Sequence, residues 1–223
     1  MMKDHTWTEL TPRLLVVPLG ATEQHGPHLP FTVDTEIAVA LCESLARQRN
    51  DVVVAPALPY GSSGEHAGFP GTLSIGQEAT ETVLVELGRS AGAFAGVLLV
   101  CAHGGNAGPL GRAVAKLRYE GRSVRAWSPR GPSEDSHAGR TETSVMLALR
   151  PEAVRLDKLE TGNTTPLPDL IDPLRAGGVR AVSPNGVLGD PFGANAKEGR
   201  EILHGWGKSL LNSVAALAAD VMM

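Results

Sequence analysis

The sequence predicts an α/β fold built around a mostly parallel β-sheet. Short apolar runs rich in β-branched residues alternate with longer segments whose apolar residues recur at helical spacing, which is the pattern of successive strand–helix–strand units. A chain of 223 residues is also long enough to bury one sizeable core. Because no internal repeat, linker or low-complexity tract interrupts it, we expect a single domain over residues 1–223.

The elements follow in order along the chain. Four apolar runs predict strands: LLVVPLG (14–20), DVVVAPALPYG (51–61), GVLLVCAHGG (96–105) and RSVRAWSPR (122–130). Segments of helical period predict helices at 34–48, 77–92 and 109–121, and a terminal helix at 195–223. Gly205 and Gly207 weaken the middle of that last helix. The segment 159–193 is rich in Pro, Gly and Asn and predicts long loops with short elements.

Composition and charge exclude several classes of partner. A hydrophobic content of 42% with 20% charged residues is ordinary for a globular protein, and a net charge of -4 is no basis for binding nucleic acid or an anionic membrane. The first residues lack the apolar region of a signal peptide, and no run reaches the ~18 apolar residues of a membrane span. The two cysteines lie in apolar stretches, as free thiols of a core do. We therefore expect a cytoplasmic protein that binds neither nucleic acid nor membrane.

Polar clusters follow the predicted strands. In chain order they are TEQHGPH, SSGEHAGFPGT, HGGNAG and SEDSHAGRTETS. In open parallel α/β sheets, ligands bind outside the carboxyl ends of the strands, so these loops should converge on one edge of the sheet. This convergence predicts a catalytic or binding site there.

The residue types in these clusters suit a metal ion. Glu23 and His25 are two residues apart, so in an extended segment their side chains point the same way. Asp34 lies at the start of a predicted helix, and His103 at the end of the third strand. Taken singly, the histidines have a structural interpretation and Asp34 is a helix cap. Together they are two acids and two imidazoles, a set suited to Zn²⁺, Mn²⁺ or Fe²⁺.

Other catalytic motifs have no support. GRSAG (88–92) matches the G-x-S-x-G pattern of serine hydrolases, but that motif must follow a strand and open a helix. Here it closes a predicted helix and precedes a strand, so Ser90 is expected in a surface turn. A phosphate-binding G-x-x-x-x-G-K-[ST] motif is absent from the sequence, which excludes the P-loop NTPases.

Four segments resemble, in order and spacing, the signature segments of the creatininase family, metal-dependent amidohydrolases that cleave C–N bonds. They are PLGATEQHGPHLPFTVDT, PYGSSGEHAGFPGTLS, CAHGGNAG and DSHAGRTETS, within residues 14–150. The resemblance implies a three-layer α/β/α sandwich and a centre of two divalent ions (Zn, Fe or Mn). It also implies a homo-oligomer, commonly a hexamer. Matched by motif, Glu23 and His103 would hold one metal and His25 the other, while Asp34 would bridge them.

The resemblance also implies the remaining catalytic groups. His137 would carry the proton, with Asp135 either orienting it or simply solvated. Creatininase itself has a glutamate where this chain has Gly105, so the second metal needs another carboxylate. Glu142 is the expected replacement, as a metal ligand or as a purely catalytic acid.

Further residues of these loops have less specific expected roles. Glu65 and His66 would contact substrate, or hold their loop by hydrogen bonds. Arg140 stands where many relatives have glutamate and would alter the charge preference for substrate. His28 would orient the metal-binding loop from behind or be structural, and Asn106 would cap the helix that follows it.

The C-terminal part narrows the expected substrate. The segment LETGNTTPLPDLIDPLRAGGVRAVSPNGVLGDPFGANAKEG resembles the tail of the creatininase-like peptidases of mycofactocin maturation. This implies hydrolysis near the C-terminus of a modified precursor peptide, releasing a small cyclised Val-Tyr-derived fragment. Two alternatives stay open: a small-molecule amidohydrolase of the same family, acting on a cyclic amide or a formamide, and a flavodoxin-like binding module without turnover.

Overall fold

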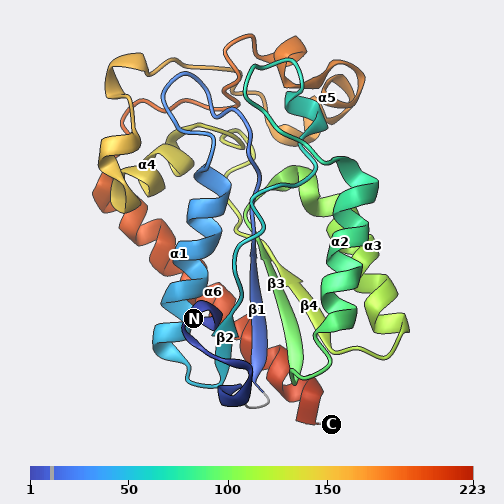
Figure 1. Cartoon of the computed structure of the whole chain (residues 1–223). Coiled ribbons are helices and arrows are strands. Elements are labelled where there is room, and N and C mark those ends of the chain that lie inside the picture. Colours follow the sequence, from blue (N-terminus) through green and yellow to red (C-terminus); the bar gives the residue numbers. More distant parts are fainter. Residues whose placement is uncertain (11–12, 223) are drawn as a thin grey trace.

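The structure, a computed structural model, describes residues 1–10 and 13–222 (Figure 1). It is a three-layer α/β/α sandwich, as the sequence analysis predicted. The central sheet has four parallel strands in the order β2-β1-β3-β4. Their bounds are β1 Leu14–Leu19, β2 Val52–Val54, β3 Gly96–Cys101 and β4 Val124–Trp127.

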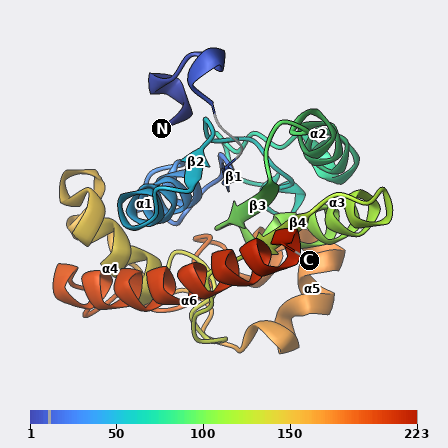
Figure 2. The same cartoon turned by 90° about the horizontal axis from the view of Figure 1, so that it is seen from below.

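Helices cover both faces of the sheet (Figure 2). One face packs against α1 (Val33–Gln48), α4 (Arg140–Leu149) and α6 (Ala196–Met222). The other face packs against α2 (Gly76–Ser90) and α3 (Ala107–Tyr119). Short 3-10 helices lie in the connections, at Met2–Asp4, Trp7–Glu9, Gly64–His66, Gly104–Asn106, Pro151–Ala153 and Leu156–Lys158.

Strand β1 contributes to both cores because successive side chains of a strand point to opposite faces. Leu14 and Val16 pack with α1 and α6, whereas Leu15 and Val17 pack with α2 and α3. All six residues of β1 are buried, which explains its continuous apolar run. The carboxyl ends of β1 and β3 are therefore held rigidly between two helical layers.

The second predicted strand is longer than the observed one, whereas the terminal helix agrees with its predicted bounds and is not interrupted at its glycines. The second strand ends at Val54, and Leu58 makes only a single bridge to Leu19, because prolines on either side of Leu58 interrupt the ladder. The terminal helix runs unbroken through Gly205 and Gly207 to Met222; residue 223 lies outside the described residues. Buried packing of α6 outweighs the low helix propensity of its glycines, about 1 kcal/mol each.

The expectation of loops over 159–193 is wrong for its middle part. Helix α5 spans Leu167–Val182, with Pro173 inside it and a kink at Gly178, whose φ is 70°. Leu170 and Val179 pack with Leu188 in a small third core, so tertiary contacts stabilise a helix that local composition disfavours. In Figure 1, α5 lies beside the loops that follow the strands. No helix in the described part of the chain has the length and hydropathy needed to cross a membrane.

The kink in α5 gives a test of this packing. Gly178→Ala should lower the free energy of unfolding by about 1–3 kcal/mol, since its backbone conformation favours glycine. An added Cβ would also lie 2.7 Å from the Glu65 carbonyl oxygen. Gly205→Ala, with open space around it in α6, should instead raise stability by about 0.5–1 kcal/mol. Denaturant unfolding of the two variants measures both, and equal changes would contradict this view of α5.

Candidate metal centre

The polar loops converge at the carboxyl ends of the strands, as expected from the parallel topology. Seven side chains lie together there and are called the acid–histidine cluster: Glu23, His25, Asp34, His66, His103, His137 and Glu142. They come from the loops after all four strands and from the first turns of α1 and α4. All are buried except Glu142, whose side chain is 17% exposed.

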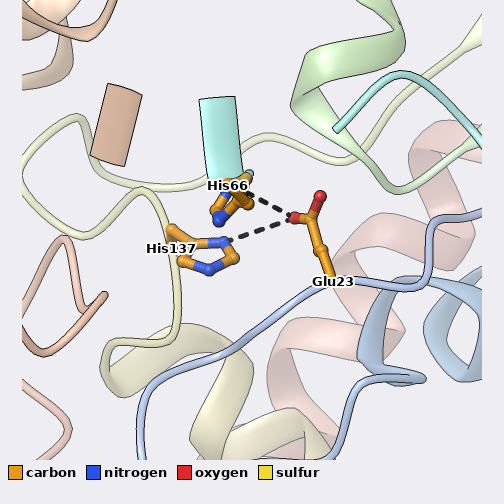
Figure 3. Close-up of side chains that lie close together, drawn as sticks. All are labelled: Glu23, His66 and His137. Carbon is orange, nitrogen blue, oxygen red and sulfur yellow. Dashed lines mark ion pairs between the residues drawn. The ribbon is translucent and has the colours of Figure 1, made fainter. Parts of the chain in front are cut away.

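Glu23 is at the centre of one half of the cluster. Its Oε1 lies 3.2 Å from His103 Nδ1, 3.5 Å from His66 Nε2 and 3.8 Å from His137 Nδ1. Figure 3 shows the last two rings directed at the Glu23 carboxylate. Asp34 Oδ2 lies 3.4 Å from the same His103 Nδ1. Glu23, Asp34 and His103 thus present three ligand atoms close enough to hold one cation.

His25 is at the centre of the other half. Its Nε2 lies 3.4 Å from Asp34 Oδ1 and 3.9 Å from Glu142 Oε2. Asp34 therefore directs one carboxylate oxygen to His25 and the other to His103. This is the arrangement expected of a carboxylate shared by two cations.

Unpaired buried atoms indicate that the residues fit a metal. Glu23 Oε2, His25 Nε2 and Asp34 Oδ2 are buried without a hydrogen-bond partner, although buried polar atoms are nearly always paired. The outer nitrogens of two imidazoles face backbone carbonyls: His25 Nδ1 lies 3.1 Å from the Glu23 oxygen, and His103 Nε2 lies 2.8 Å from the Ser62 oxygen. Such contacts leave the other nitrogen directed at the cluster, as in metal-binding histidines. Carboxylates and imidazoles together suit Zn²⁺, Mn²⁺ or Fe²⁺.

Electrostatics also favours a cation. Burial lowers the pKa of His25, but Asp34 and Glu142 outweigh it and raise that pKa to about 10. Burial likewise lowers the pKa of His103, and the charges of Glu23 and Asp34 raise it to about 10. Burial raises the pKa of Glu142 to about 7. Without a metal, protons on two imidazoles therefore compensate the buried acids.

His66 and His137 are neutral. Burial lowers the pKa of His66 to about 4, and burial with the positive charge of His25 holds the pKa of His137 well below its usual range. His137 Nε2 lies 2.8 Å from the backbone oxygen of Gln24, so Nδ1 is the nitrogen that faces the cluster. The neutral ring therefore presents an unprotonated nitrogen to the cluster.

Glu65 fills the space left by Gly105. Its Oε1 lies 4.0 Å from His103 Nε2, and burial raises its pKa. A Cβ on Gly105 would lie 2.5 Å from His103 Nε2 and even closer to Glu65 Oε1 and the Ser62 carbonyl oxygen. The backbone therefore has no room for a glutamate at this position.

The remaining predicted residues have structural contacts. Arg140 is half-exposed and pairs with Glu198 at 2.9 Å, so its charge is compensated there; its role toward substrate stays a prediction. Asp135 neither orients His137 nor is simply solvated, because its carboxylate accepts hydrogen bonds from the first backbone N–H groups of α4, at 2.7–2.8 Å. His28 is buried, and its Nε2 lies 2.9 Å from Thr143 Oγ1.

Asn106 is the N-cap residue of α3, as expected, but its side chain makes no capping hydrogen bond. Its Oδ1 accepts a hydrogen bond from the Ser62 N–H at 2.8 Å, and its Nδ2 donates to the Gly20 carbonyl at 3.1 Å. Asn106 thereby joins the loops after β1, β2 and β3. The sequence analysis assigned no role to Gln24, whose side chain lies against His66 and His137. In an extended segment, that side chain is expected to point away from those of Glu23 and His25.

Comparison with known proteins now identifies the family. The family described as "Creatininase: Creatinine amidohydrolase" matches residues 3–214. This chain belongs to the creatininase family. The sequence prediction of a hydrolase of this family is confirmed.

Individual relatives agree with this assignment. The chain is 52% identical over 196 residues to the "Mycofactocin precursor peptide peptidase" of Mycolicibacterium smegmatis, covering 85% of this chain and 79% of that protein. It is 32% identical over 193 residues to the "Creatinine amidohydrolase" of Pseudomonas putida, covering 69% and 73%. A mutant creatininase complexed with creatine has the same fold, with a TM-score of 0.78, 25% identity and 95% and 96% coverage. Creatininases of similar fold have been solved in Zn-Zn and Mn forms.

The protonated imidazoles predict that metal binding releases protons. Because the pKa values of His25 and His103 are raised to about 10, a cation must displace both protons at about pH 7.5–8.5. The apparent metal affinity should rise by about 100-fold per pH unit in that window, ten-fold for each proton. Calorimetry in buffers of different ionisation enthalpy counts the protons released. Release of no protons, with an affinity independent of pH, would contradict this assignment.

Two adjacent glycines test the close packing around His103. Gly105→Ala should reduce metal content or stability, because its Cβ has no space. Gly104→Ala is the matched control, since a Cβ there meets nothing within 4 Å. Metal analysis and thermal unfolding of both variants make the comparison. A Gly105→Ala protein that binds metal like the Gly104→Ala protein would show that the spacing is not required.

Proposed function

We propose that this chain is a divalent-metal-dependent peptidase that cleaves the mycofactocin precursor peptide near its modified C-terminus, releasing a cyclised Val-Tyr-derived fragment. The observation that carries the proposal is the 52% identity to the M. smegmatis precursor peptide peptidase, over 85% of this chain. The acid–histidine cluster is the chemistry that such a hydrolase needs. A homo-oligomer, commonly a hexamer in the family, and a cytoplasmic location stay predictions.

We further propose that the cluster holds two ions. Glu23 and His103 would hold one, His25 and Glu142 the other, and Asp34 would be shared. The opposite directions of the two Asp34 oxygens support the shared role. Divalent ions bound there would polarise the scissile carbonyl and lower the pKa of a bound water toward neutrality.

His137 would move the proton of the reaction. Its unprotonated Nδ1 faces the cluster, where it would accept the proton of the attacking water. The same nitrogen then donates that proton to the departing amine, which would otherwise leave as an unstable anion. Burial raises the pKa of Glu142 to about 7 in the absence of a metal, so an ion that binds Glu142 near neutral pH would displace part of its proton.

Two cavities adjoin the cluster and support a peptide substrate. The larger, of about 620 Å³, includes His103, Glu142, Arg130 and Trp206 in its lining. The smaller, of about 410 Å³, is lined by different residues, including His25 and a group of apolar side chains, Leu29, Phe31 and Phe69. Ligand cavities usually measure about 300–1,000 Å³. A peptide could occupy both cavities while its scissile bond lies at the cluster, whereas a small cyclic amide needs only one.

The second candidate is a small-molecule amidohydrolase of the same family. The observation in its favour is the 32% identity to the creatinine amidohydrolase of P. putida. The absence of space for a glutamate at Gly105 argues against the same active-site arrangement as creatininase. Membership in a hydrolase family leaves no reason to prefer a flavodoxin-like binding module.

A substrate panel tests the proposal. Metal-loaded protein is incubated with modified precursor peptide, unmodified precursor and creatinine, and products are followed by mass spectrometry. Cleavage of the modified peptide is expected; hydrolysis of creatinine alone would contradict the peptidase assignment.

Asp34→Asn should abolish cleavage and metal binding, whereas exposed Asp172→Asn should change neither. His137→Ala should keep the metal and slow turnover by about 10²–10⁴.

A further inference from the structure

We propose that Gln24 is a positioning residue whose side chain fixes the tautomer of His66, so that His66 supports the Glu23 carboxylate instead of binding metal. Gln24 is 6% exposed and lies between two proposed metal ligands. The proposal rests on the proposed metal centre but not on the identity of the substrate. It assigns different roles to two histidines that both face Glu23 (Figure 3).

The orientation of the Gln24 amide follows from its partners. Its Oε1 accepts a hydrogen bond from the Gly26 N–H at 2.7 Å, so Nε2 is at the opposite end of the amide. Nε2 lies 3.0 Å from the Gly186 carbonyl oxygen, which is only an acceptor, and 2.9 Å from His66 Nδ1. An amide nitrogen has two hydrogens, and these two partners use both.

The tautomer of His66 follows from the same contacts. Since Nδ1 accepts a hydrogen bond from Gln24, the proton of the neutral ring is on Nε2. That protonated Nε2 faces Glu23 Oε1 at 3.5 Å. Metal binding by Nε2 would require this proton to move to Nδ1, where it would meet the N–H of Gln24. Glu23, His66 and His137 are close enough together to hold an ion, but the hydrogen on His66 Nε2 excludes that arrangement.

The main chain of Gln24 sets the tautomer of His137 separately. His137 Nε2 lies 2.8 Å from the Gln24 carbonyl oxygen and must donate its hydrogen there. The 3.1 Å approach of Gln24 Nε2 to the same nitrogen supplies no third hydrogen, because both amide hydrogens are already in use. His137 therefore presents a bare Nδ1 to the cluster, whereas His66 presents an N–H.

Side-chain replacement should consequently affect one histidine and spare the other. In Gln24→Glu, the carboxylate has no hydrogen to donate, so His66 Nδ1 must become the donor. The neutral tautomer with its proton only on Nε2 would then be lost, whether the ring gains a second proton or moves the one it has. His137 should keep its tautomer, because the main-chain carbonyl is unchanged. Gln24→Met removes the hydrogen-bonding groups without adding charge and is the matched control.

Ring nitrogen NMR of the zinc-loaded, ¹⁵N-histidine-labelled protein tests this assignment. In the native chain, His66 and His137 should both be neutral with the proton on Nε2. Gln24→Glu should put a proton on His66 Nδ1 and leave His137 unchanged, and Gln24→Met should allow both neutral tautomers of His66 while leaving His137 unchanged. A metal-bound nitrogen or an Nδ1 proton on His66 in the native chain would overturn the proposal, whether or not the variants fold.

Enzyme kinetics provide a second measurement. Disturbing groups that support a metal ligand usually reduces metal affinity or activity by about 10–100-fold. Gln24→Glu should show that loss in kcat with little change in KM, since no substrate contact is removed. A change confined to KM would place Gln24 in substrate binding and contradict the positioning role. A protein inactive on every peptide would refute the proposed function, while the NMR result would still decide the role of Gln24.

Discussion

The burial of two carboxylates beside a third, partly exposed one at one edge of the sheet is the constraint on which this structure depends. Glu23, Asp34 and Glu142 lie within a few ångströms of one another's imidazole partners, and Glu23 and Asp34 are almost fully enclosed. An unpaired buried charge costs several kcal/mol. Positive charge must therefore be supplied, by protons on His25 and His103 or by metal ions that replace them. The raised histidine pKa values and the unpaired carboxylate oxygens are two consequences of this one requirement.

The fold keeps these charges in place because both faces of the sheet are packed. Strands β1 and β3 contribute to two separate helical cores, so their carboxyl ends have little freedom to move. Asn106 then ties the first three loops together through hydrogen bonds with Ser62 and Gly20. Close packing at Gly105 leaves no space for a larger residue beside His103. Rigid strands and interlocked loops hold donor atoms near each other before any ion binds.

The sequence predicted the part of the site that depends on topology. Glu23, His25, Asp34 and His103 follow strands or begin helices, and parallel strands bring such positions to one edge. What it missed depends on contacts between distant residues. Gln24 contacts His66 and Gly186, which lie 42 and 162 residues away in the sequence, and the spacing of nearby residues does not indicate these contacts. Helix α5 was missed for the same reason, because its support comes from Leu188 rather than from its own proline- and glycine-rich composition.

The expectations for Asp135, that it orients His137 or is simply solvated, were wrong for a different reason. A carboxylate two residues before His137 is near it in sequence, but the backbone N–H groups that open α4 are nearer in space and need a partner. Helix capping therefore took precedence over the catalytic role considered for Asp135. The family resemblance named the residues that meet, and the structure shows which atoms of each face the cluster.

Anomalous diffraction from crystals of the zinc-loaded protein, recorded above the zinc edge, tests the central claim most directly. We expect two peaks, one beside Glu23 and His103 and one beside His25 and Glu142, with the Asp34 carboxylate between them. A single peak bound by His66, or no peak at the cluster, would contradict the account.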